Sequence, residues 1–114
     1  MSETIDVSAL TTLLETIGGD KEFLDELIVT FLEDAPGMLD DMDIAVADQD
    51  ADKLRLVSHS LKTNSAQFGA TALFELCRDV ELQAKEGDFA ASQVAEARTE
   101  FEIVRQALEN LREV

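Results

Sequence analysis

The chain has 114 residues, 46% of them hydrophobic, and a net charge of −16 because 25 acidic side chains outnumber nine Lys and Arg. This length and hydrophobic fraction predict one folded domain, residues 1–114, with a modest core. The acidic charge excludes nucleic acid and anionic membrane surfaces as partners, since both would repel the chain. No apolar run approaches the roughly 20 residues that cross a bilayer, and no basic-then-apolar leader begins the sequence. We therefore expect a cytoplasmic protein without membrane insertion, and the single cysteine suits that reducing compartment.

The composition predicts an all-α protein, because the chain has one proline, no Trp or Tyr, and no sustained β-type alternation. Asp6 is placed to cap a first helix, which the glycine pair 18–19 ends. Asp20 is placed to cap a second helix, 21–47, in which Pro36 removes an amide donor. We interpret 21–47 as one long kinked helix or as two coaxial pieces.

Three alternating acids precede the next helix, and they resemble the start of a calcium loop. Lys53 stands where such a loop needs its Gly, and His59 stands where it needs its bidentate Glu. We therefore interpret the acids as the start of the helix that contains His59, where negative charge complements the helix dipole. The acids are Asp48, Asp50 and Asp52.

Two more helices complete the chain. Gly69 breaks the third helix before a fourth at 71–86, Gly87 stops that one, and Asp88 is placed to cap the last. The fourth helix has inward residues at Leu73, Leu76, Cys77, Val80 and Ala84. The last helix carries an apolar stripe at Val94, Ala97, Phe101, Val104, Leu108 and Leu111. Such a stripe serves either as part of the core or as a dimer seam, and the short connections favour the core and hence a monomer. Short connections also imply antiparallel neighbours. We therefore expect an antiparallel four-helix bundle with an additional N-terminal helix across one end.

The third helix contains the only histidine and an unusual distribution of charge. Between Asp52 and Glu75 there is no Asp or Glu, while three bases fall there: Lys53, Arg55 and Lys62. On a helical wheel the inward stripe is Leu54, Val57, Leu61, Ser65 and Phe68. His59 lies about 160° from Leu61 and therefore points at water. Its face is shared by the neighbours one or two turns away, namely Arg55, Lys62, Thr63 and Ala66, and Leu56 is outward without a core to fill.

This arrangement favours a phosphoryl-accepting histidine over the other roles of the residue. The outward phase argues against a buried core histidine, although an ordinary surface histidine remains an alternative. A role for His59 as a metal ligand is disfavoured, because the chain has no second His and its one cysteine, Cys77, is distant in the sequence. A role as the base of a hydrolase is disfavoured too, because no Ser or Cys nucleophile pattern and no Gly-rich oxyanion turn accompany His59. A neutral imidazole is a nucleophile, since the reference pKa of histidine is about 6.5, and the Lys62 ammonium both disfavours imidazolium and can bind a transferred phosphoryl group.

The stretch 58–70 resembles the signature of histidine-containing phosphotransfer (HPt) domains, H-x-L-K-G-x-[SA]-x-x-[LF]-G-A. The match includes His59, Leu61, Lys62, Ser65, Phe68, Gly69 and Ala70. The flanks are also similar to the family, from 6–13 through 18–20, 23–36 and 73–81, so that the resemblance covers nearly the whole chain. Thr63 departs from the pattern, because the family most often has Gly there. It puts the fine geometry of docking in question, although it is still small and its hydroxyl is a donor for phosphoryl oxygens.

The resemblance implies a phosphorelay carrier with no ATP site, rather than an autonomous kinase. His59 would accept a phosphoryl group from a receiver-domain phospho-aspartate and pass it to an aspartate of another receiver, and Lys62 would stabilise the group. Gln67 is a weaker candidate for a phosphate or docking contact, and the docking surface would comprise Arg55, Leu56, Thr63 and Ala66. The partners would be receiver domains of response regulators or of a hybrid sensor histidine kinase, and these would supply the Mg²⁺, since the chain would have no cofactor or metal of its own. We expect this docking face to be free of acids, which avoids repulsion from the receiver's carboxylates.

Two alternatives remain at this stage. A helical interaction module could dock receiver or kinase domains without being phosphorylated on His59. An acid-rich bundle enzyme or metal carrier is disfavoured because inward Glu-x-x-His pairs are absent. The chain could be free-standing or a fragment of a hybrid sensor kinase.

Overall fold

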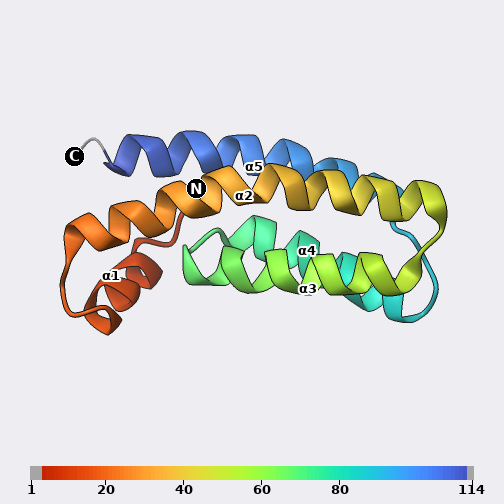
Figure 1. Cartoon of the computed structure of the whole chain (residues 1–114), viewed down its shortest axis with the longest axis horizontal. Coiled ribbons are helices and arrows are strands. Elements are labelled where there is room, and N and C mark those ends of the chain that lie inside the picture. The colour runs from red at the N-terminus through yellow and green to blue at the C-terminus, as the bar shows by residue number, and fades with distance from the viewer. Residues whose placement is uncertain (1–3, 113–114) are drawn as a thin grey trace.

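The computed structural model describes residues 4–112, which form helices without any strand. The helices are α1 (Val7–Thr16), α2 (Lys21–Asp48), α3 (Ala51–Gln67), α4 (Thr71–Lys85) and α5 (Ala91–Arg112). In Figure 1, α2 and α5 lie side by side in one layer, α3 and α4 form the other, and α1 packs at one end. The predicted antiparallel four-helix bundle with an additional N-terminal helix is therefore confirmed. No helix within 4–112 is both long and apolar enough to cross a membrane.

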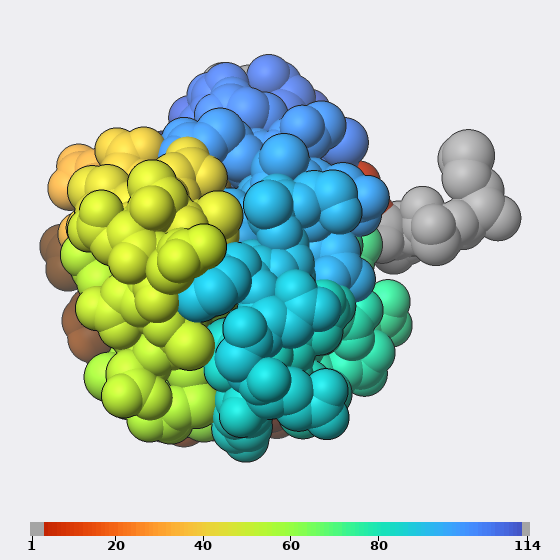
Figure 2. Space-filling model, turned by 90° about the vertical axis from the view of Figure 1, so that its right-hand side faces the viewer, coloured from red at the N-terminus to blue at the C-terminus, as the bar shows by residue number. Residues whose placement is uncertain are grey.

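Short connections join the antiparallel helices. Figure 2 shows the bundle end where α2 passes into α3 and α4 passes into α5, with the two connections next to each other. The longest dimension of the molecule is 42 Å, which matches the length of α2 at about 1.5 Å per residue. α2 therefore sets the length of the bundle.

Aspartates begin three of the helices as predicted. The carboxylates of Asp6, Asp20 and Asp50 accept hydrogen bonds of 3.0 Å from backbone N–H groups in the first turns of α1, α2 and α3. The predicted cap at Asp88 is wrong, because its carboxylate accepts from Ala90 N–H and α5 begins only at Ala91. The chain at Phe89 packs against the core there instead of starting a helix.

Pro36 lies within α2 without dividing it. The helix runs from Lys21 to Asp48, so the interpretation as two coaxial pieces is wrong. Pro36 itself is exposed, and the apolar face of the helix continues on both sides of it through Phe31, Ala35, Leu39 and Met42, all buried. Packing of this continuous face offsets the hydrogen bond that proline removes.

The inward stripe of α3 is more polar than predicted. Leu54, Leu61 and Ser65 are buried as expected, but Val57 is only half-buried and Ser58 is buried in its place. Each buried hydroxyl donates to the carbonyl one turn earlier, Ser58 Oγ to Leu54 O and Ser65 Oγ to Leu61 O. Burial of these two serines therefore leaves no hydroxyl without a partner, on the helix whose pairing with α4 is the most extensive in the bundle.

The stripes predicted on the fourth and last helices are buried with two exceptions, and an aromatic cluster joins α2, α3 and α5. Phe68 stacks on Phe31 at a centroid distance of 4.8 Å, and Phe31 meets Phe101 edge-on at 6.0 Å. Cys77 is fully buried, and burial raises the pKa of its thiol to about 12. The exceptions are Leu76, which is half-buried, and Leu111, which is 39% exposed.

Gly69 fixes the turn that follows α3. Its φ of +74° is a conformation that glycine adopts without strain. Its carbonyl accepts from Asp6 N–H at 2.7 Å, which attaches the start of α1 to the end of α3. A Cβ at this position would lie 2.4 Å from Asp6 O. Gly69 is therefore required both by backbone conformation and by the close approach of the N-terminal segment.

We predict that Gly69→Ala is much more destabilising than Gly18→Ala. Both positions have positive φ, but a Cβ at Gly18 meets nothing within 4 Å. Gly18→Ala should lower the free energy of unfolding by roughly 1–2 kcal/mol through backbone strain alone. Gly69→Ala should cost roughly 1–3 kcal/mol more because the Asp6 backbone must move. Urea denaturation of both variants measures the difference, and equal losses would contradict the assigned close contact.

Candidate functional site

His59 lies in the middle of α3, on the face that the helical wheel predicted. Its side chain is 59% exposed, whereas Ser58 beside it is fully buried. The ring therefore reaches solvent from a rigid helix rather than from a loop. A side chain placed in this way is accessible to another macromolecule while its backbone is held by bundle packing.

A buried carboxylate from the neighbouring helix holds the ring. Glu81 of α4 is 7% exposed at its side chain, and its Oε2 lies 2.9 Å from His59 Nδ1. Its other oxygen, Oε1, lies 2.6 Å from the ammonium of Lys62, which is itself 23% exposed. Both carboxylate oxygens of Glu81 are thus engaged, one by the histidine and one by the lysine.

Glu81 remains ionised despite its burial. Burial raises the pKa of its carboxyl, but the hydrogen bonds and charges of Lys62 and His59 outweigh that effect and bring the pKa below its usual value. An ionised carboxylate has only acceptor atoms, so His59 Nδ1 must carry the hydrogen in their contact. The neutral ring then has its lone pair on Nε2, away from Glu81.

The prediction of an acid-free docking face is wrong. The sequence between Asp52 and Glu75 has no acid, but α4 places Glu81 against His59 and Lys62. The sequence carried a signal for this residue. Glu81 falls between Cys77 and Ala84 on the stripe predicted to face inward, where an unpaired carboxylate would be very costly.

The predicted docking residues surround His59 on α3. Leu56 is 57% exposed and Ala66 is exposed, whereas Arg55 is half-buried. Thr63 is exposed, and its hydroxyl donates to His59 O at 3.1 Å. Gln67 is exposed at the last position of α3, and no hydrogen bond in the described chain joins it to His59.

Sequence reasoning also missed an apolar side chain on α4. Leu82 follows Glu81 and is 52% exposed. It is therefore an exposed leucine on the helix that supplies Glu81. Among residues 4–112, no three His, Cys, Asp or Glu side chains gather into a group able to hold a metal ion.

Comparisons with known proteins agree with this geometry. The family model described as Hpt domain matches residues 26–114. The sensor protein TorS of Escherichia coli K12 is 33% identical over 81 residues, which are 71% of this chain but only 9% of TorS. The phosphorelay protein LuxU of Vibrio vulnificus YJ016 is 31% identical over 86 residues, covering 75% of this chain and 73% of LuxU.

Solved structures extend the likeness to the whole chain. Histidine-containing phosphotransfer protein B (HptB) of Pseudomonas aeruginosa PAO1 superposes with a TM-score of 0.89 and 27% identity, over 99% of this chain and 97% of that one. The HPT domain of a Shewanella hybrid histidine kinase shares the fold, with a TM-score of 0.74 and 17% identity over 95% and 92% of the two chains. From the family match and the likeness to LuxU, the chain belongs to the histidine-containing phosphotransfer (Hpt) domain family.

Proposed function

We propose that this chain is a phosphorelay carrier that accepts a phosphoryl group on His59 from the phospho-aspartate of one receiver domain and passes it to an aspartate of another. The observation that carries the proposal is the contact of buried Glu81 with His59 Nδ1, which leaves Nε2 exposed as a nucleophile. The descriptions of LuxU as a phosphorelay protein and of HptB as a phosphotransfer protein support it. The carrier would act in the cytoplasm, where we expect its receiver partners.

The chemistry follows from the hydrogen bond at Nδ1. The Nε2 lone pair attacks the phosphorus of the aspartyl phosphate, a P–N bond forms, and the P–O bond to the aspartate breaks with its electron pair leaving on the carboxylate. No proton is transferred, since the Nδ1 hydrogen stays in place. The ring gains positive charge as the bond forms, and the Glu81 carboxylate stabilises that charge. The reverse of this step delivers the phosphoryl group to the second receiver.

Lys62 is placed to stabilise the phosphoryl group. Its ammonium contacts the Glu81 carboxylate, which His59 contacts as well. Its flexible stem lets the ammonium move from Glu81 toward a phosphoryl group bound to the His59 ring. The Thr63 hydroxyl is bonded to His59 O and would have to rotate to reach the phosphoryl oxygens. Mg²⁺ held by the receiver would neutralise charge on those oxygens, and the residues described above supply positioning and the nucleophile.

The docking surface would combine an exposed leucine with local charge balance. Leu56 would offer apolar contact from α3, and Ala66 and Thr63 would allow close approach. Glu81 is buried and paired with Lys62, so its negative charge is largely neutralised before a receiver arrives. Arg55 then leaves the face cationic toward the carboxylates of a receiver site.

We predict that His59→Gln abolishes labelling by a phosphorylated, radiolabelled receiver domain, and that Lys62→Ala slows transfer by about tenfold or more. The matched control is Lys53→Ala, which removes another lysine of α3 and should change the rate less than about twofold. The label on the wild type should be acid-labile and base-stable, as expected for a phosphoramidate. Label retained by His59→Gln would overturn the site assignment, and a wild type that takes up no label would favour an interaction module that is not phosphorylated.

The Glu81 contacts should also appear in the pH dependence of stability. A carboxyl whose folded pKa is lowered contributes stability above its unfolded pKa of about 4.3, and loses it as pH falls through the lower folded value. Glu81→Gln should therefore lower the free energy of unfolding by roughly 1–3 kcal/mol at about pH 6 and by much less at about pH 3. Urea denaturation at both pH values measures the loss of stability. Glu102→Gln is the control, because Glu102 is exposed and is paired with Arg105. A pH-independent loss would contradict the ionised state of Glu81.

A further inference from the structure

A second surface feature lies away from His59, at the end of the bundle where α1 packs. It is a groove of about 970 Å³ formed by α1, the first turns of α2 and the last turns of α5. Its apolar lining comes from Leu10, Leu14, Leu24, Ile28 and Leu111. Leu111 is the residue of the α5 stripe that the bundle core does not cover, since it is 39% exposed.

The groove is separate from the phosphotransfer face. None of its lining residues belongs to α3 or α4, whereas His59 and Glu81 lie on those two helices. In Figure 1, α2 and α5 form the layer opposite α3 and α4. A molecule bound in the groove would therefore leave His59 accessible to a receiver domain.

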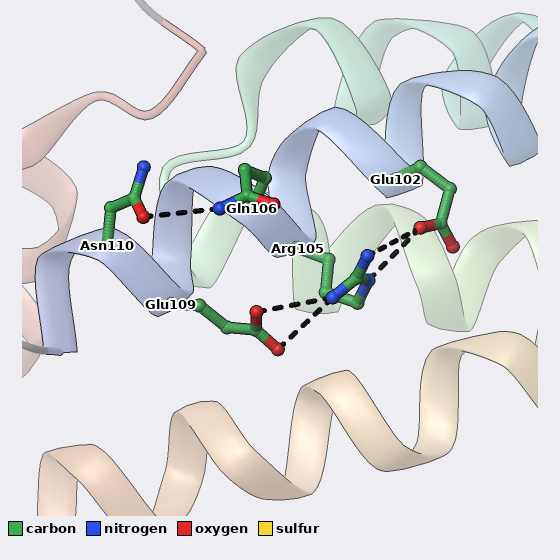
Figure 3. A network of polar contacts seen from close by, with 5 residues as sticks. All are labelled: Glu102, Arg105, Gln106, Glu109 and Asn110. Atoms are coloured by element: carbon green, nitrogen blue, oxygen red, sulfur yellow. Dashed lines mark hydrogen bonds and ion pairs between the residues drawn. The ribbon is translucent and has the colours of Figure 1, made fainter.

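The rim of the groove is acidic. Its lining includes four carboxylates, Glu22, Asp25, Glu26 and Glu109, against the two cations Lys21 and Arg112. Asp25 is paired with Arg112, and Glu109 is held by Arg105 within the α5 network of Figure 3. Glu22 and Glu26 are exposed one turn apart on α2, and no ion pair within residues 4–112 neutralises them.

We propose that this groove binds an amphipathic helix of a partner protein, with apolar side chains on its inner face and Lys or Arg along its edges. The apolar lining requires an apolar occupant, and the volume is large enough for several side chains. The carboxylates of the rim, on a chain of net charge −16, select a cationic partner and repel a second copy of this chain. Such an attachment holds the carrier near its partner while the His59 face remains free, which raises the effective concentration for transfer. Binding of a helix in the groove does not depend on phosphorylation of His59, whereas the gain in transfer rests on the proposed function.

The test is an NMR titration of the full ¹⁵N-labelled chain with a helical peptide of about 18 residues, with Leu on one face and Lys on the other. A scrambled peptide of equal composition and charge controls for non-specific attraction to an acidic protein. We expect saturable shifts confined to α1, 21–28 and 105–112 with the amphipathic peptide, and only weak, dispersed shifts with the scrambled one.

Variants separate the apolar and the charged parts of the groove. Leu111→Ser should weaken peptide binding about fivefold, and the exposed pair Glu22→Lys with Glu26→Lys about tenfold or more. Leu56→Ser, which changes a more exposed leucine on the α3 face that carries His59, should leave the affinity for the peptide unchanged. Equal binding of both peptides, shifts centred on α3 and α4, or indifference to the charge reversals would overturn the proposal. Binding of a small apolar dye that the amphipathic peptide does not displace would overturn it too, in favour of a small-molecule site.

Discussion

The buried carboxylate of Glu81 is the interaction on which the site depends. A charge at this depth between two helices is tolerated only because each oxygen has a cationic or hydrogen-donating partner, His59 on one side and Lys62 on the other. The same contacts that stabilise Glu81 orient the ring and restrain the lysine. Stability of the α3–α4 pair and geometry of the phosphoacceptor are thus two consequences of one three-residue arrangement.

The bundle holds this arrangement in place through the packing of α3 on α4. Ser58 and Ser65 are buried in α3 with their hydroxyls satisfied within the helix, and the Glu81 carboxylate of α4 contacts His59 and Lys62 on α3. Gly69 anchors the end of α3 to the start of α1 through its bond to Asp6 N–H. A histidine on so constrained a helix keeps its nucleophilic nitrogen in one direction, so docking of a partner needs little reorganisation of the carrier.

The sequence predicted those structural features that depend on residues close together in the chain. The caps at Asp6 and Asp20, the acids that begin α3, the extent of α2 and α4, and the exposure of His59 and Leu56 all follow from spacing of a few residues. What the sequence did not reveal depends on contacts between helices. Glu81 meets His59 from 22 positions away, Phe89 packs on the core ahead of α5, and Leu111 lies where α5 borders the groove. A helical wheel places a residue on its own helix but cannot identify the side chain that the next helix brings to it.

The most direct test of this account is the tautomer of the unphosphorylated His59 ring, which long-range ¹H–¹⁵N NMR of the two ring nitrogens reports at a pH where the ring is neutral. The account predicts that the hydrogen is on Nδ1, next to the Glu81 carboxylate, and that Nε2 gives the signal of an unprotonated nitrogen. A ring with its hydrogen on Nε2 would contradict it, because the exposed nitrogen would then have no lone pair with which to attack phosphorus.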